Sequence, residues 1–261
     1  MFRNPRESAP NPAVSEPLRA LHPLPVIAWG PLALAYLGVP IVVGTHMFAV
    51  RDEDYKAAAQ MLLNSGFRLT TPSRGPPDEV LNTLPDPEAV LEEINSGYRY
   101  LDRSSKTFDY PAHLPEREEQ LVLMPNSFCR LGIDLSTISM WSKTTDCDVY
   151  GNMLYPSERI LLESFVKAAV DDDSLSSEGG GYSDITSWGE LLRSWVSMMV
   201  GYLGIGKDTI DFSSDKRAMD WYSRNFGRIY EEKNGPIDRR VTKRIGSGKE
   251  MAYDMAGTPI E

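Results

Sequence analysis

Residues 29–67 have the sequence WGPLALAYLGVPIVVGTHMFAVRDEDYKAAAQMLLNSGF, and the order of its segments governs the predicted fold. Apolar runs alternate with glycine and proline, and short runs bounded in this way are typical of buried strands. Gly30 and Pro31 mark a turn, and the block after them fits a short helix. We therefore predict a strand from Pro25 to Trp29, a helix from Pro31 to Leu37 and a second strand from Val39 to Val50.

The acidic residues after the second strand indicate the start of another helix. The segment RDEDYK places carboxylates at the positive end of a helix dipole, which stabilises them. Apolar residues then recur at helical spacing, and Gly66 is a natural stop. We predict a helix from Asp52 to the region of Gly66, followed by a short strand from Phe67 to Thr70.

The apolar run from Leu24 to Val50 is also long enough to cross a bilayer. Prolines and glycines in or beside this run would interrupt a membrane helix repeatedly, because each proline removes a hydrogen bond. They are Pro23, Pro25, Pro31, Pro40, Gly30, Gly38 and Gly44. We therefore favour buried strands over a membrane span and expect no membrane partner.

The rest of the chain divides into an α/β part and a mostly helical part. Up to residue 150 we predict a loop over residues 71–77, a helix from Pro87 to Ser96 capped by Asp86, a strand from Tyr98 to Leu101, a surface excursion from Arg103 to Glu119 and a buried strand from Leu121 to Pro125. Beyond residue 150 we predict a helix over residues 156–170, a helix capped by Thr186, and helices over residues 213–230 and 236–245.

These elements predict an α+β fold, in which helices flank a mixed β-sheet and a mostly helical part follows. The predicted divisions are a flexible N-terminal arm (1–22), an α/β domain (23–150), a helical domain (151–250) with a flexible loop at 171–183, and a tail (251–261). The arm is rich in Pro, Ser and Asn, and it lacks the apolar core of a secretory signal.

The composition is that of an ordinary folded protein, and it excludes several classes. The chain has 261 residues, with 41% hydrophobic and 25% charged residues. Its formal net charge of −10 repels phosphate backbones, so we expect no nucleic-acid partner. Two cysteines, Cys129 and Cys147, are too few for a secreted disulfide scaffold. We expect a soluble, cytoplasmic protein with free thiols, although the two cysteines are also able to pair.

The order of strand, glycine turn, short helix, strand, acidic helix start and final Gly-Phe in residues 25–67 resembles the opening of the nucleotidyltransferase superfamily. The similarity is strongest to its small antitoxin-type members and their degenerate relatives. In that family a Gly-Gly or Gly-Ser turn opens a helix, and the following strand carries Asp-x-Asp. The resemblance implies a nucleotidyltransferase-like sheet, with a third carboxylate on a later strand.

The chemistry of that family depends on carboxylates at i and i+2 of one strand, which share Mg²⁺ bound to a nucleotide triphosphate. The resemblance places these positions at Thr45 and Met47, and no Asp or Glu occurs between Glu16 and Asp52. Proline also stands second in the glycine turn, where it offers a phosphate no N–H. Glu119 is the nearest match to the third carboxylate.

The missing carboxylates predict a nucleotidyltransferase-like protein that has lost metal-dependent transfer and binds a small molecule or a protein between its two parts. The alternative is an active transferase of altered mechanism that uses the cleft around Gly30, Thr45 and His46. We expect no metal or cofactor and assign no catalytic residue. The candidate ligand-binding residues are Trp29, Gly30, Pro31, Thr45 and His46.

Other motifs favour ordinary structure over chemistry. The segment GYLGIGK (201–207) fits part of a phosphate-binding loop, but Asp208 replaces the metal-binding hydroxyl and a helix precedes the motif. The acidic run at residues 171–173 fits a solvated loop. The bulky residues of the helical half fit a hydrophobic core; they are Trp188, Trp195, Met198, Met199 and Trp221. The basic cluster near the C-terminus fits a solvated helical face; its members are Arg239, Arg240, Lys243 and Arg244.

Overall fold

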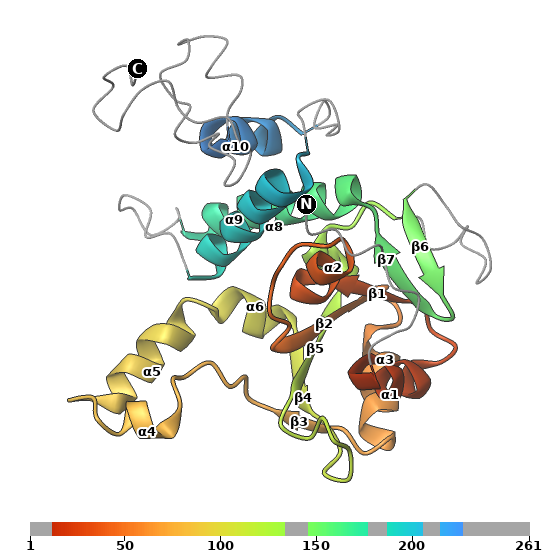
Figure 1. Ribbon diagram of the computed structural model, residues 1–261, viewed down its shortest axis with the longest axis vertical. Coiled ribbons are helices and arrows are strands. Elements are labelled where there is room, and N and C mark those ends of the chain that lie inside the picture. Colours follow the sequence, from red (N-terminus) through yellow and green to blue (C-terminus); the bar gives the residue numbers. More distant parts are fainter. Residues whose placement is uncertain (1–11, 134–145, 177–186, 206–214, 227–261) are drawn as a thin grey trace.

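The computed structural model describes residues 12–133, 146–176, 187–205 and 215–226. Seven strands form one mixed sheet in the order β3-β4-β5-β2-β1-β7-β6, and helices flank it (Figure 1). Helices dominate the chain after this sheet. The predicted α+β class is therefore confirmed.

The first part of the chain supplies most of the sheet. Its elements are α1 (Pro12–Leu21), β1 (Val26–Trp29), α2 (Gly30–Tyr36), β2 (Thr45–Val50), α3 (Tyr55–Asn64), β3 (Arg68–Thr70), α4 (Asp78–Leu81), α5 (Pro87–Ser96), α6 (Arg99–Ser104), β4 (Lys106–Asp109), β5 (Gln120–Pro125) and α7 (Asn126–Cys129).

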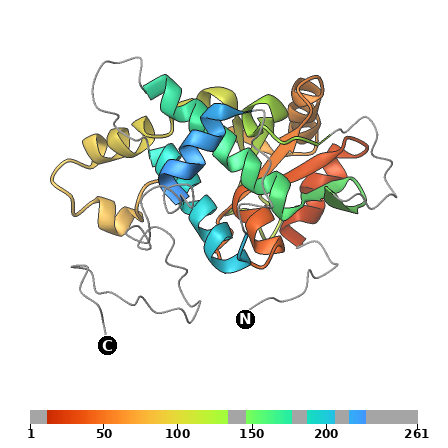
Figure 2. The ribbon, with the colours of Figure 1, turned by 90° about the horizontal axis from the view of Figure 1, so that it is seen from above.

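The second part completes the sheet and adds the long helices. Its elements are β6 (Cys147–Tyr150), β7 (Met153–Pro156), α8 (Glu158–Ser176), α9 (Ser187–Met198), the π-helical turn η2 (Met199–Leu203) and α10 (Lys216–Phe226). In Figures 1 and 2, α8 and α9 lie between α10 and the sheet, and α8 packs against both of the other helices.

The central strands follow the prediction closely. Strand β1 runs antiparallel to β2, with Trp29 opposite Met47, and β5 runs parallel to β2. The second strand is shorter than predicted, because it begins at Thr45 and not at Val39. Both neighbouring strands end at this level, so the residues before Thr45 have no strand to pair with.

The predicted boundary at residue 150 is wrong. It falls inside a hairpin, in which β6 pairs antiparallel with β7, and β7 then lies parallel to β1 in the sheet. The backbone of Val26 and Ile27 is thereby joined to that of Met153 and Leu154. The two parts therefore share one sheet, because a strand from beyond the predicted boundary satisfies the open edge of β1.

The flexible N-terminal arm predicted for residues 1–22 is also wrong over its second half. Residues 12–21 form α1, and Val14, Leu18 and Leu21 are buried in the core. Their spacing of four and three residues puts them on one helical face, which belongs to the core, and α1 packs beside α3. Polar composition suggested a loose segment, but this apolar stripe is enough to dock it. Residues 1–11 lie outside the described residues.

Two elements between residues 98 and 109 were predicted wrongly. The strand expected at Tyr98 to Leu101 is instead the N-cap and first turn of α6, because Tyr98 and Leu101 are three residues apart and so share a helical face. The surface excursion predicted after Arg103 contains β4, whose Thr107 and Phe108 are buried between β3 and β5. Polar residues around Phe108 concealed this strand in the sequence.

The acidic run at residues 171–173 belongs to the last turns of α8, not to a flexible loop. Asp171 forms an ion pair with Arg130 at 2.7 Å, and Asp172 is buried. Residues 177–183, the cap Thr186, the helix predicted at 236–245, the tail at 251–261 and the end of the GYLGIGK motif all lie outside the described residues. The part of that motif that is described follows a helix and not a strand.

The core joins the sheet to both helical layers. Trp188, Trp195, Met199 and Trp221 are buried, as predicted for the helical half. Cys129 and Cys147 are both buried and neither forms a disulfide among the described residues, and burial raises the pKa of the Cys129 thiol well above its ordinary value. Within the described ranges, no helix has the length and apolar character required to span a membrane.

Candidate functional site

Trp29 occupies the centre of an aromatic cluster at the end of β1. Its ring lies 5.1 Å from Phe165, 5.6 Å from Trp195 and 5.8 Å from Trp188, between ring centroids. The side chain is completely buried. Trp29 is therefore a core residue, and its predicted ligand-binding role stays a prediction.

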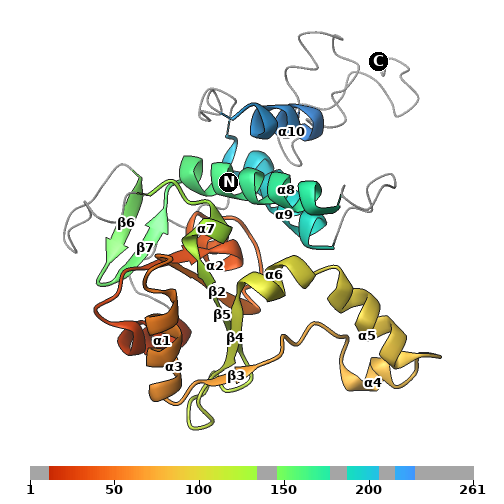
Figure 3. The ribbon, with the colours of Figure 1, turned by 180° about the vertical axis from the view of Figure 1, so that it is seen from behind.

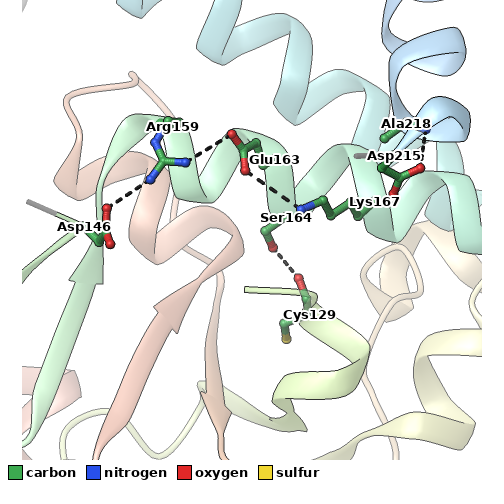
Figure 4. Close-up of polar contacts among 8 residues, drawn as sticks. All are labelled: Cys129, Asp146, Arg159, Glu163, Ser164, Lys167, Asp215 and Ala218. Carbon is green, nitrogen blue, oxygen red and sulfur yellow. Dashed lines mark hydrogen bonds and ion pairs between the residues drawn. The ribbon is translucent and has the colours of Figure 1, made fainter. Parts of the chain in front are cut away.

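The indole N–H of Trp29 is held by a polar relay from α8. It donates to Ser164 Oγ at 2.8 Å, and the Ser164 hydroxyl donates to the carbonyl oxygen of Cys129. Figure 4 shows Ser164 pointing from α8 toward Cys129, beside a partly buried chain of charges in which Arg159 links Asp146 to Glu163. The relay fixes α8 and α7 against β1, because each polar group in it is buried and needs its partner.

Gly30 lies directly after Trp29, and the space beside it is filled by the protein itself. Its φ is +57°, and a Cβ placed there would lie 2.6 Å from Met47 Sδ and 3.2 Å from the Trp195 ring. Met47 and Trp195 are both buried. The described geometry therefore leaves no room for a ligand group against Gly30. Pro31 is half-buried at the first turn of α2, and its binding role stays a prediction.

The first positions of β2 and β5 carry neutral polar groups. Thr45 pairs with Gln120 in the parallel register, and Asp109 pairs with Gln120 on the other side. The Gln120 amide is bonded on both atoms: its Nε2 donates to Asp109 Oδ1 and Thr71 O, and its Oε1 accepts from the Ser73 backbone N–H. Thr45 is half-buried, and its binding role also stays a prediction.

His46 is buried on the opposite face of the sheet. Successive side chains of a strand point to opposite faces, so Thr45 and Met47 share the face of Trp29, whereas His46 does not. The His46 ring contacts Tyr110, with 3.3 Å between Nδ1 and the Tyr110 oxygen, and Glu119 Oε2 lies 3.2 Å from Nδ1. His46 is 1% exposed.

The hydrogen bonds around Tyr110 determine which ring nitrogen of His46 carries the proton. The Tyr110 hydroxyl donates its one hydrogen to the Ala13 carbonyl oxygen of α1 at 2.7 Å. The Tyr110 oxygen is then only an acceptor toward His46, so the His46 proton is on Nδ1. Nε2 is left as a buried acceptor without a hydrogen-bond partner among the described residues.

Burial controls the ionisation of this group. Desolvation lowers the pKa of His46 from its ordinary value, against the opposing effect of the Glu116 charge. Burial, with the nearby Glu116, raises the pKa of Glu119, and burial together with both carboxylates raises the pKa of Tyr110. The cluster therefore favours a neutral imidazole under α1, which suits a structural histidine better than a general base open to substrate.

The sequence-predicted site is thus divided between two faces. Gly30 and Met47 meet on the face covered by α9, whereas His46 contacts Tyr110 and Glu119 on the face covered by α1. The structure therefore does not bring His46 to the face of the sheet on which Gly30 lies. In the described ranges, no three His, Cys, Asp or Glu side chains are grouped so that they could hold a metal ion.

Several residues that shape these two faces were not found from the sequence. They include Ser164 beside Trp29, Gln120 opposite Thr45, and Tyr110 beside His46. Trp195 was recognised as bulky but not as the neighbour of Gly30. Each of these partners lies far away in the sequence, and a local pattern contains no signal for such a pairing.

The chain matches no family model, and no curated protein and no solved structure is significantly similar to it.

Proposed function

We propose that this chain is a nucleotidyltransferase-like protein that does not carry out metal-dependent transfer and acts by binding another protein. The order of elements supports this proposal. Helix α2 connects antiparallel strands β1 and β2, α3 follows, and β5 then lies parallel to β2. The succession of strand, glycine turn, short helix, strand and helix over residues 25–67 is the one that the resemblance implies.

The packing at Gly30 carries the proposal. In a nucleotidyltransferase the glycine turn holds the phosphates of the nucleotide, which requires open space and free N–H groups. In this chain Met47 and Trp195 occupy that space, and Pro31 has no N–H. A protein partner is the better candidate, because a protein can bind an outer surface and needs no cavity at this turn.

The positions of the expected carboxylates support the same conclusion. Thr45 and Met47 stand where the resemblance places Asp-x-Asp, and Gln120 is opposite Thr45 on β5. The amide of Gln120 is already bonded to Asp109 and to the backbone. Glu119, the expected match to the third carboxylate, is directed toward His46 and so toward the other face. A shared metal ion needs carboxylate oxygens on one face.

An active transferase that combines Gly30, Thr45 and His46 is less well supported. His46 and Met47 are adjacent on β2, so their side chains leave opposite faces of the sheet. The imidazole lies beneath α1, where Tyr110 and Glu119 surround Nδ1.

The proposal is tested by an assay for nucleotidyl transfer. The full chain is incubated with each nucleoside triphosphate and Mg²⁺ or Mn²⁺, and pyrophosphate release is measured for the wild type and for Thr45→Ala. We expect both proteins to release the same background level. Release that depends on the metal ion and is lost in Thr45→Ala would refute the proposal.

Nucleotide binding is measured separately by thermal unfolding in the same buffers. A ligand present at about 100 times its Kd adds about 2.7 kcal/mol to the stability of the folded state. We expect no such increase with any nucleotide. An increase in stability with a nucleotide that disappears in Gln120→Leu would indicate a nucleotide site at the first positions of β2 and β5. That result would contradict protein binding as the function of this fold.

A further inference from the structure

Helices α4 and α5 form a projection that extends away from the sheet. We call residues 76–98 the α4–α5 projection, and Figures 1 and 3 show it reaching outward from β3 and α6. It leaves the body after the loop that precedes α4 and returns at α6. This part of the chain belongs neither to the sheet nor to the helical layers that cover it.

The apolar side chains of the projection have little to pack against. None of them is buried, and Val80 is 50% exposed. None belongs to the hydrophobic core or to the half-buried side chains packed against it, unlike Tyr98 at the base. The set consists of Val80, Leu81, Leu84, Val90, Leu91 and Ile94. Val80 is exposed and the other five are half-buried, so the projection presents aliphatic surface that the folded chain covers only in part.

The base of the projection is firmly attached. Arg74 forms two hydrogen bonds with the Asp102 carboxylate, at 2.5 and 2.7 Å, and its guanidinium lies 4.3 Å from the centre of the Tyr98 ring. The backbone N–H of Trp188 donates to the Gly97 carbonyl oxygen at 3.0 Å. Both ends are thus held by α6 and α9, and the helices between them are presented in a defined place.

The helices themselves are short. Helix α4 has 4 residues and α5 has 10, and helices of this length are marginal in water without tertiary packing. Asp86 caps α5 by accepting from the Ala89 N–H, which satisfies only one of its free donors. A partner that covers the aliphatic side chains would supply the packing that the chain itself does not.

The charge of the projection identifies the kind of partner. Residues 76–98 contain no lysine or arginine, and their six carboxylates belong to Asp78, Glu79, Asp86, Glu88, Glu92 and Glu93. A second copy, a nucleic acid or an anionic membrane would bring like charges together, which is unfavourable. A cationic segment with an apolar face matches both the charge and the exposed aliphatic residues.

We propose that the α4–α5 projection is the docking site for a basic amphipathic segment of a partner protein. The aliphatic side chains cover the apolar face of that segment, and exposed Glu88 and Glu93 pair with its lysines or arginines at the rim. Glu92 is already paired with Arg99 at 2.6 Å, just beyond the projection. Rim charges mainly speed association and are screened by salt, whereas the apolar contact holds the complex. The inference rests on the proposed protein-binding function and names its surface and its partner class.

Two peptides test the docking site. One is a helical leucine–lysine peptide with all leucines on one face, and the other has the same composition in scrambled order, so that it keeps the charge and loses the apolar face. Their binding to the full chain is measured by fluorescence anisotropy. We expect the amphipathic peptide to bind at least about tenfold more tightly, because each further 1.4 kcal/mol of contact is a factor of ten.

Matched variants locate the binding surface. Val80→Ser and the double variant Glu88→Gln/Glu93→Gln should each weaken binding of the amphipathic peptide several-fold, and the second should also reduce the salt dependence. The controls are Leu69→Ser, whose side chain is 59% exposed on β3, and Glu118→Gln in the loop before β5. We expect both controls to bind like the wild type. All of these positions are exposed, so thermal unfolding should show intact folding.

Three outcomes would overturn the docking site. They are equal binding of the two peptides, equal losses in the control variants, and binding that appears only when Arg239, Arg240, Lys243 and Arg244 are all changed to Gln. The last result would indicate that the basic cluster of the same chain, and not a partner protein, occupies the projection. The nucleotidyl-transfer assay does not involve the projection, so failure of the docking test and failure of the proposed loss of transfer are read from different experiments.

Discussion

Gly30 shows how one residue determines the character of the site. A left-handed backbone conformation is needed for the chain to leave β1 and enter α2 at once, and glycine adopts it without steric cost. The absent side chain also lets Met47 and Trp195 pack directly on the turn. The feature that resembles a phosphate-binding turn therefore serves packing here.

A substitution at Gly30 should separate strain from crowding. Gly30→Ala introduces the left-handed cost of about 1–2 kcal/mol and a close contact with Met47. We expect the free energy of unfolding to fall by about 2–4 kcal/mol in urea titrations. Gly151→Ala is the control, because Gly151 has φ +61° and open space around its Cβ position. An equal loss in both variants would show that the contact with Met47 does not matter.

At the scale of elements, α8 is attached to the sheet by a buried polar relay as well as by apolar packing. Trp29 and Ser164 are 135 positions apart, and their hydrogen bond joins β1 to α8. The Ser164 hydroxyl then reaches the last residue of α7. One side chain thereby fixes three elements that meet around the aromatic cluster.

Removing the Ser164 hydroxyl should loosen this junction. Ser164→Ala leaves the buried Trp29 N–H and the Cys129 carbonyl without their partner, which costs about 1–3 kcal/mol of unfolding free energy. Ser194→Ala on the exposed side of α9 is the matched control and should change stability little. Intrinsic tryptophan fluorescence, to which the buried Trp29 cluster contributes, gives a second readout. If both variants unfold at the same urea concentration, the relay is not a stabilising feature.

At the scale of the whole molecule, the sheet separates two environments. One face holds Trp29 and Met47 beneath α8 and α9, and the other holds His46 and Tyr110 beneath α1. The bond from Tyr110 to Ala13 connects the α1 backbone to the group around His46. The ionisation of His46 is therefore coupled to the packing of the entire N-terminal layer.

This coupling predicts how stability changes with pH. The folded pKa of His46 lies below 6.5, so the unfolded chain takes up a proton first as the pH falls, and stability decreases from about pH 6.5 downward. The raised pKa of Glu119 has the opposite effect on stability above pH 4.5. The folded state holds the Glu119 proton more tightly than the unfolded state does, so stability falls as the pH rises and this proton is lost.

The contribution of His46 is isolated by comparing variants. Urea unfolding is measured between pH 5 and 7.5 for the wild type, for His46→Gln and for the double variant His22→Gln/His113→Gln, in which both histidines are exposed. We expect the loss of stability below pH 6.5 to be smaller in His46→Gln and unchanged in the double variant. An unchanged slope in His46→Gln would show that another group controls the acid sensitivity.

The sequence alone determined the elements whose signal is local. The apolar runs around Trp29 and Phe48, the Gly30 turn and the capped helix at Pro87 all follow from periodicity and punctuation in short windows. Missing carboxylates near β2 are equally local. These features were enough to predict the mixed sheet and its flanking helices.

Only the tertiary structure decided which of these residues meet. It placed β7 beside β1, docked α1 on the core, and sent His46 and Met47 to opposite faces. It also filled the space beside Gly30 with Trp195 from α9. The reason is that such contacts join residues distant in the sequence, so burial and pairing across the sheet fix them, and no short-range pattern encodes their partners.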